Sequence, residues 1–160
     1  MKDKIKLELK KLFDDCKYTA ETHYTIASRS KTIDFWSRLI PAVLTASLSV
    51  IEVAFEPESQ ILITLILASA VTTATTNVLG AKEKYESHNN AGRKFTRLKK
   101  LCSKTLVIDS EYLTETELNV TYDSLLCRYL DAIDETPPTE NWAFGKAQIR
   151  IQKDKVHEPD

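Results

Sequence analysis

The feature that most limits how this chain folds is an uncharged run of 23 residues, SQILITLILASAVTTATTNVLGA, at positions 59–81. A helix needs roughly 20 apolar residues to cross a hydrocarbon core of about 30 Å, and this run is long enough. A second run, at positions 39–55, carries Glu52 as its only charge. It reaches spanning length together with Phe35 and Trp36, which resemble the aromatic residues of a membrane interface. The two runs form either a membrane hairpin or the buried helices of a soluble bundle.

The placement of cations separates these two interpretations. All 22 Lys and Arg residues lie outside positions 39–81, and the connection between the runs carries Glu56 and Glu58 but no cation. A two-span hairpin with both termini in the cytoplasm needs this distribution under the positive-inside rule. A soluble bundle has no reason to exclude cations from an exposed turn. We therefore predict a transmembrane helical hairpin with spans at about 36–55 and 59–81.

Three amphipathic segments flank the hairpin and predict cytoplasmic helices at about 3–34, 82–106 and 114–134. Few Gly and Pro residues interrupt these segments before residue 135, so the sequence predicts an all-α fold: a long N-terminal amphipathic helix, the hairpin and a cytoplasmic helical bundle. We predict a single domain at 1–135 and a polar, frayed C-terminal tail at 136–160. The apolar stripes are Ile5, Leu9, Leu12, Cys16, Thr19, His23, Ile26, Ser30 and Ile33; His88, Ala91, Phe95, Leu98 and Cys102; and Leu118, Tyr122, Leu125, Leu126, Tyr129, Leu130 and Ile133.

Small and polar residues recur at helical spacing inside the two runs. Such residues let helix backbones approach closely in lipid, and their hydroxyls can hydrogen-bond across the contact. Two interpretations stay open: packing of the hairpin, or a polar path lined by several copies of the chain. Glu52 lies near the turn, where a carboxylate reaches the membrane interface, whereas a deeper position would indicate function. The candidate residues of this polar face are Thr45, Ser49, Glu52, Ser69, Thr72, Thr73, Thr76 and Asn77.

No combination of residues indicates an enzyme, a metal site or a bound cofactor. With only three glycines, the chain has no Gly-rich phosphate-binding loop and no nucleophile elbow. The three histidines, His23, His88 and His157, lack metal-ligand spacing. His23 and His88 lie on apolar seams, where we expect helix-packing histidines. Each of the three cysteines lies among apolar residues at helical spacing, which predicts buried thiols in a reducing compartment: Cys16, Cys102 and Cys127.

Cations are concentrated in one segment, GRKFTRLKKLCSK, at positions 92–104. A solvated helix face explains this segment without any ligand, and contact with anionic lipid of the inner leaflet is the functional alternative. The formal net charge of −1 and the pI near 6.3 give no reason to expect binding to nucleic acid.

The order of these segments resembles the SLATT family (SMODS and SLOG-associating two-transmembrane effector domain). The resemblance covers about residues 18–133. It is most specific in SRLIPAVLTASLS and in the pattern Y-x-x-H-x-x-A-G-x-x-F-x-x-L, which begins at Tyr85. The family has no established catalytic residues, so the matching positions count as juxtamembrane candidates, with His23 as a candidate bundle residue. These juxtamembrane candidates are Arg38, Lys82, Tyr85, His88, Gly92, Arg93 and Phe95.

The resemblance implies an effector of a bacterial antiviral defence system that is linked to nucleotide signals and stops growth of the infected cell. It implies location in the bacterial inner membrane, assembly into a homo-oligomer, perturbation or perforation of that membrane, and activation by a nucleotide-signalling or sensor partner protein. The residues themselves leave two alternatives open. One is a membrane-anchored scaffold without a pore, and the other is a soluble helical interaction module.

Overall fold

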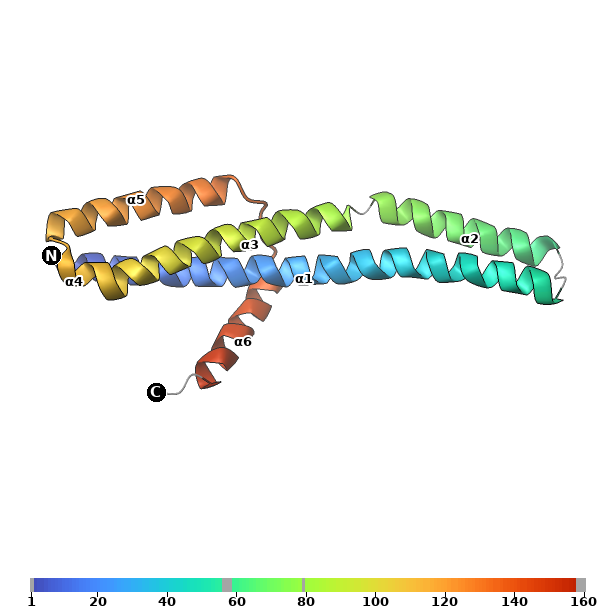
Figure 1. Cartoon of the computed structure of the whole chain (residues 1–160), viewed down its shortest axis with the longest axis horizontal. Helices are drawn as coiled ribbons and strands as arrows, with labels where there is room; N and C mark the ends of the chain where they lie inside the picture. Colours follow the sequence, from blue (N-terminus) through green and yellow to red (C-terminus); the bar gives the residue numbers. More distant parts are fainter. Residues whose placement is uncertain (1, 56–58, 79, 158–160) are drawn as a thin grey trace. The chain divides into compact units, whose positions relative to one another are not determined.

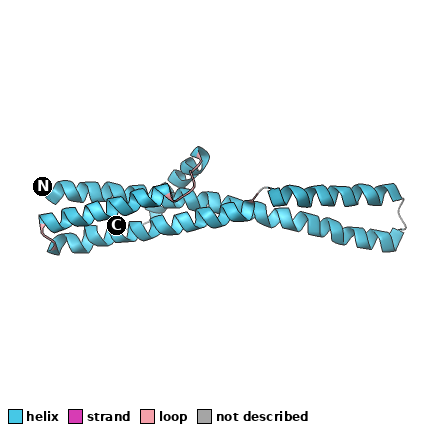
Figure 2. Ribbon diagram, turned by 90° about the horizontal axis from the view of Figure 1, so that it is seen from above, coloured by secondary structure: helices cyan, strands magenta, loops and turns pink. Residues whose placement is uncertain are grey.

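The computed structural model describes residues 2–55, 59–78 and 80–157, with the backbone alone described at 48–55, 59, 61–62, 72, 75–78 and 154–157. Every regular element in these residues is a helix, so the predicted all-α fold is confirmed (Figures 1 and 2). The elements follow in the order α1 (Lys2–Phe55), α2 (Ser59–Val78), α3 (Ala81–Lys104), the π-helical turn η1 (Thr105–Asp109), α4 (Ser110–Tyr112), α5 (Glu115–Asp134) and α6 (Asn141–His157).

The chain divides into two compact units rather than the single predicted domain. One unit combines residues 1–27 with residues 86–160 and is called the bundle here. The other unit, residues 28–85, is called the hairpin. Helix α1 contributes to both units, because it runs from Lys2 to Phe55 without interruption. The predicted helix at about 3–34 and the predicted span at about 36–55 are thus parts of one helix.

The bundle core confirms most of the predicted stripes, although Ile33 at the end of the first stripe is 41% exposed. In Figures 1 and 2, α3 and α5 lie alongside the N-terminal part of α1. Leu9, Phe95 and Leu118 are fully buried at 0% exposure, and each comes from a different helix. Leu130 and Ile133 of the third stripe are exposed instead, and Ala132 takes the buried position. The stripe therefore continues along α5, but its last turn is shifted by one residue.

Local chemistry explains where helix α5 begins. The Thr114 side chain accepts a hydrogen bond from the backbone N–H of Glu117, and the Glu117 carboxylate accepts one from the backbone N–H of Thr114. This reciprocal capping box satisfies donors that the first turn of a helix cannot satisfy itself. Helix α5 therefore begins at Glu115, one residue from the predicted start.

The predicted polar tail is wrong, because the segment forms helix α6 and packs on α1. Ala143 and Ala147 are fully buried, and Ile151 is 3% exposed. An ion pair joins Arg150 to Glu21 at 3.1 Å. The small side chains of the two alanines allow close packing of α6, and the apolar side chains are too few and too small to stand out in a polar sequence.

The hairpin consists of the C-terminal part of α1, helix α2 and the first turn of α3. Gly80 connects α2 to α3 with a φ of +54°, a left-handed conformation that glycine adopts without steric cost. Its carbonyl accepts the backbone N–H of Lys84 at 2.9 Å, which starts α3. Among the described residues, no helix has both the length and the hydropathy that a membrane span requires. The two predicted spans stay predictions.

Candidate functional site

A polar contact joins the two helices of the hairpin. The hydroxyls of Thr45 on α1 and Ser69 on α2 lie 3.1 Å apart and form a hydrogen bond. Thr45 also donates to the Pro41 carbonyl at 2.9 Å, and Thr73 donates to the Ser69 carbonyl at the same distance. The hydroxyls of Thr45 and Ser69 are thus used in packing between the helices, while the Thr73 side chain is exposed.

Large apolar side chains are exposed throughout the hairpin. Val71 and Leu67 on α2 are 64% and 60% exposed, and Val43 on α1 is 54% exposed. The aromatic rings of Phe35 and Trp36 pack edge to face, yet more than half of each side chain is exposed. Among the described side chains, each helix of the hairpin therefore presents several large apolar residues that the other helix does not cover. The remaining exposed apolar residues of the hairpin are Ile33, Leu39, Ile40, Ile63 and Ile66.

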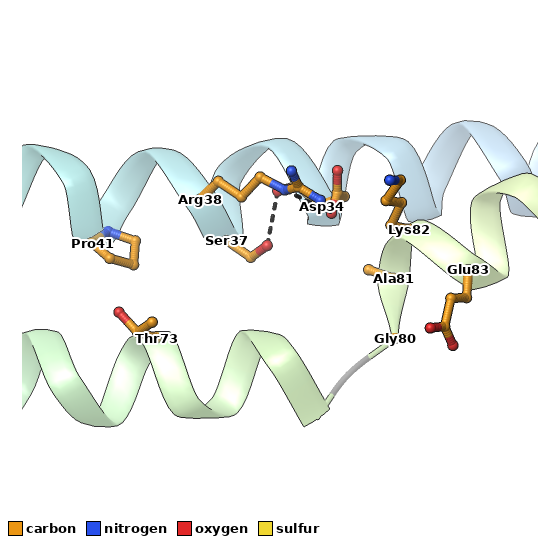
Figure 3. Close-up of a pocket in the computed structure, with 9 residues that line it drawn as sticks. All are labelled: Asp34, Ser37, Arg38, Pro41, Thr73, Gly80, Ala81, Lys82 and Glu83. Atoms are coloured by element: carbon orange, nitrogen blue, oxygen red, sulfur yellow. Dashed lines mark hydrogen bonds and ion pairs between the residues drawn. The ribbon is translucent and has the colours of Figure 1, made fainter.

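A cavity of about 490 Å³ lies at the base of the hairpin, where the chain turns from α2 into α3 (Figure 3). Arg38 lines it and forms an ion pair with Asp34 at 2.9 Å. Lys82 lines the α3 side, and Thr73 lines the α2 side. Three predicted candidates from separate segments, Arg38, Thr73 and Lys82, are therefore brought to one cavity. Its charged side chains balance, because Asp34 and Glu83 offset the two cations.

In the bundle, two histidines form a buried pair. The Nδ1 atoms of His23 and His88 lie 2.9 Å apart, so one ring donates its Nδ1–H and the other accepts it. His23 is 1% exposed and His88 is 3% exposed. The His23 ring also stacks on Phe95, with centroids 5.6 Å apart. Burial, aided by the neighbouring His88, lowers the pKa of His23 to about 4. The prediction of helix-packing histidines is confirmed.

The Y-x-x-H-x-x-A-G-x-x-F-x-x-L pattern has a packing explanation within the bundle. A Cβ atom on Gly92 would lie 2.8 Å from the Tyr24 ring, so only glycine lets α1 approach α3 here. The Tyr24 hydroxyl shares a hydrogen bond with the Thr96 hydroxyl at 3.2 Å. Ala91 and Phe95, which directly precede Gly92 and Thr96, fill the core. The pattern therefore specifies the contact between α1 and α3.

The cysteines divide into a buried pair and an exposed residue. Cys16 and Cys102 are both fully buried, as predicted. A hydrogen bond with Cys102, added to burial, raises the pKa of the Cys16 thiol, and the same bond lowers the pKa of Cys102. Cys127 is exposed, so the prediction for this residue is wrong. It lies two residues after the buried Leu125, and its leucine neighbours gave it an apolar neighbourhood in the sequence.

The other candidates are not brought together. Tyr85 is half-buried, and Arg93 is exposed on α3. The side chains of Ser49, Glu52, Thr72, Thr76 and Asn77 lie outside the described residues. Tyr24, which the sequence did not single out, matters to the contact between α1 and α3. It directly follows His23 of the first stripe but does not belong to the stripe.

No three His, Cys, Asp or Glu side chains among the described residues are grouped to hold a metal ion. No protein-family model, curated protein or solved structure matches the chain.

Proposed function

We propose that this chain is a two-span membrane effector of a bacterial antiviral defence system, with both termini in the cytoplasm. The observation that carries the proposal is the hairpin's exposed apolar surface, with Leu67 at 60% and Val71 at 64% exposure. Apolar patches of this extent are rare on monomeric soluble proteins and mark membrane or protein contacts. Lipid fits both helices, because neither carries a Lys or Arg between positions 39 and 81.

The cations at the base of the hairpin support the same topology. Arg38 and Lys82 line one cavity at the end of the uncharged runs, beside Phe35 and Trp36 on α1. Aromatic and basic residues concentrate where a membrane meets the cytoplasm. Effector activity, homo-oligomerisation and activation by a nucleotide-signalling or sensor partner rest on the resemblance to the SLATT family.

A scaffold without a pore is the second candidate, and a specific contact favours it. The hydroxyls of Thr45 and Ser69 hydrogen-bond to each other within one copy of the hairpin. Hydroxyls used in this way stabilise helix packing in lipid and are not free to line a polar path. Under this alternative the hairpin anchors the bundle, and membrane permeability does not change.

Fractionation with an alkaline carbonate wash tests membrane insertion. We expect the wild-type chain to stay with the membranes. Leu67→Arg places a charge at the middle of α2, which costs about 3 kcal/mol in a transmembrane helix and releases part of the protein. Val120→Arg is the matched control, because Val120 is 63% exposed on α5 in the bundle. Release of the wild-type chain by the wash would favour the soluble interaction module and remove the effector proposal.

A membrane-potential dye distinguishes the effector from the scaffold. Triggered or overproduced protein should depolarise cells and stop growth. Replacing Thr72, Thr73, Thr75 and Thr76 with Val should abolish depolarisation and leave carbonate-resistant insertion intact. If the wild-type chain inserts but never depolarises cells in the presence of its triggering partner, the scaffold is the better description.

A further inference from the structure

A groove runs between α3 and α5 of the bundle, and its chemistry differs from that of the hairpin. It consists of two hollows, of about 360 Å³ and about 250 Å³, and Arg128 lines both. Figures 1 and 2 show the two helices side by side along this part of the bundle. Leu98 and Leu125 contribute to its apolar floor, and Arg97 lines the second hollow. The groove is therefore an apolar surface with guanidinium groups from two helices.

These two guanidinium groups have no partner in the described part of the chain. Neither Arg97 nor Arg128 forms an ion pair or a side-chain hydrogen bond with another described residue, and both side chains are exposed. The other cations of the groove are paired, Lys94 with Glu135 at 2.6 Å and Lys104 with Asp109 at 3.1 Å. The contrast leaves the donors of two arginines available for a ligand.

The charges around the groove favour an anion. Besides the paired Asp109 and Glu135, Asp131 is the one carboxylate among the described residues that line the groove. Its negative charge offsets part of the positive charge of Arg97 and Arg128. Arg93 and Lys100 lie one turn on either side of Arg97 on α3, and both are exposed without an ion pair to a described residue. Two unpaired cations and one unpaired carboxylate thus line the groove among the described residues, and Arg93 and Lys100 add further positive charge along α3.

We propose that the groove between α3 and α5 binds a phosphate-bearing anion through Arg97 and Arg128. Arginine presents a planar fork of donors that matches phosphate oxygens, and charge-assisted bonds of this kind are stronger than neutral ones. The phosphate comes either from an anionic lipid headgroup or from a free phosphate compound. A phosphate bound to both arginines joins α3 to α5, so its occupancy links ligand binding to the packing of the bundle.

Isothermal titration with inorganic pyrophosphate tests the free source, using the full chain in a neutral detergent at constant ionic strength. Arg97→Gln with Arg128→Gln should weaken binding at least about tenfold, since the substitutions remove charge-assisted hydrogen bonds from both helices. Arg97→Lys with Arg128→Lys keeps the charge but loses the fork, and should recover only part of the affinity. The matched control is Lys4→Gln with Lys10→Gln, which removes two exposed cations from α1.

Hydrogen exchange in nanodiscs tests the lipid source. We expect α3 and α5 to exchange more slowly in discs that contain phosphatidylglycerol than in discs of phosphatidylcholine alone. The Gln pair should remove this difference, and the Lys4/Lys10 pair should keep it. A pyrophosphate effect alone assigns a free phosphate compound, and a lipid effect alone assigns a headgroup.

Equal behaviour of the Gln pair and the control pair in both experiments would overturn the proposal, because any binding would then follow bulk charge. The result is independent of the proposed membrane function. A chain that the carbonate wash releases still gives a valid pyrophosphate titration. A chain that inserts firmly but shows no effect of Arg97 and Arg128 keeps its hairpin and loses only this site.

Discussion

Helix α1 allows a direct comparison of the two units, because it contributes to both. In the bundle its apolar side chains follow one stripe, and Leu9 and Leu12 are no more than 4% exposed. In the hairpin its large apolar side chains are exposed, with Phe35 at 58% and Val43 at 54%. The same helix therefore has two kinds of surface. The bundle part is covered by neighbouring helices of the chain, whereas the hairpin part presents apolar surface to its surroundings.

The difference teaches that charge, more than apolar content, separates the two parts. Charged residues occupy the outer faces of α1 in the bundle, so its stripe has a clear helical period. Between Leu39 and Phe55, Glu52 is the only charged residue, and no face of the helix is marked as outer. A helix that is apolar all round is buried in a protein core or in lipid.

The largest expected effect comes from the same substitution in the two units. Phe95→Ala removes a fully buried ring from the bundle core, and should lower its free energy of unfolding by about 3–5 kcal/mol. Phe35→Ala removes a ring that is 58% exposed in the hairpin, and should change bundle unfolding by less than about 0.5 kcal/mol. Chemical denaturation in a neutral detergent, followed by circular dichroism, measures both. Similar losses would mean that the hairpin and the bundle unfold as one unit.

The histidine pair should make bundle stability depend on acid. The folded-state pKa of His23 is about 4, below its usual 6.5, so between these values the unfolded chain binds more protons. Stability is therefore fully present at pH 7, begins to fall below about pH 6.5 and continues to fall towards pH 4. The expected loss is about 1.4 kcal/mol per pH unit inside this window, or about 3 kcal/mol in total.

The control for this pH dependence replaces both rings. His23→Leu with His88→Leu removes both partners of the hydrogen bond and keeps an apolar contact, so its stability at pH 7 should change little. The loss of unfolding free energy between pH 6.5 and 4 should become smaller by about 3 kcal/mol, the amount expected for His23. If the double variant loses as much stability between pH 6.5 and 4 as the wild-type chain, other titratable groups cause the loss.

Two glycines of the bundle differ in the space around them, and the same substitution at each should have opposite effects on stability. Gly92→Ala drives a methyl group into the Tyr24 ring and should cost about 1–3 kcal/mol. Gly145→Ala meets no atom within 4 Å in α6 and should stabilise the bundle by about 0.5–1 kcal/mol. Thermal unfolding measures both. Tyr24→Leu in the Gly92→Ala background should recover part of the loss, and no recovery would place the strain elsewhere.

The fold was predictable where apolar side chains repeat with a helical period. The second stripe, from His88 to Cys102, is entirely buried, because charged residues on the other faces of α3 leave one apolar side. Helix α6 was missed because Ala143 and Ala147 contribute little apolar signal, although their small size is what lets the helix pack. The shift at Ala132 has the same cause, since the neighbouring Ile133 is larger and more apolar.

A site could be predicted from the sequence only where its residues lie close together in one segment of the chain. His88, Gly92 and Phe95 belong to one short pattern, but the close approach of Tyr24 to Gly92 depends on how α1 and α3 pair. Arg128 could not be linked to Arg97, because their shared groove forms only when α5 lies beside α3. In the hairpin, the sequence left open whether the polar residues pack the two helices or line a polar path. The hydrogen bond between the Thr45 and Ser69 hydroxyls shows that these two take part in packing.

The smallest expected effect tests that contact. A double-mutant cycle of Thr45→Val and Ser69→Ala should give a coupling energy of about 0.6 kcal/mol, the usual value for hydrogen bonds between membrane helices. Unfolding by dodecyl sulfate in lipid bicelles measures it. Thr64→Val is the control, because the Thr64 hydroxyl donates to the Gln60 carbonyl of its own helix at 2.8 Å, so its cycle with Ser69→Ala should give no coupling. A measured coupling would favour packing and the scaffold. A coupling near zero, together with depolarisation that Thr45→Val abolishes, would mean that these hydroxyls face a polar path between copies, as the effector requires.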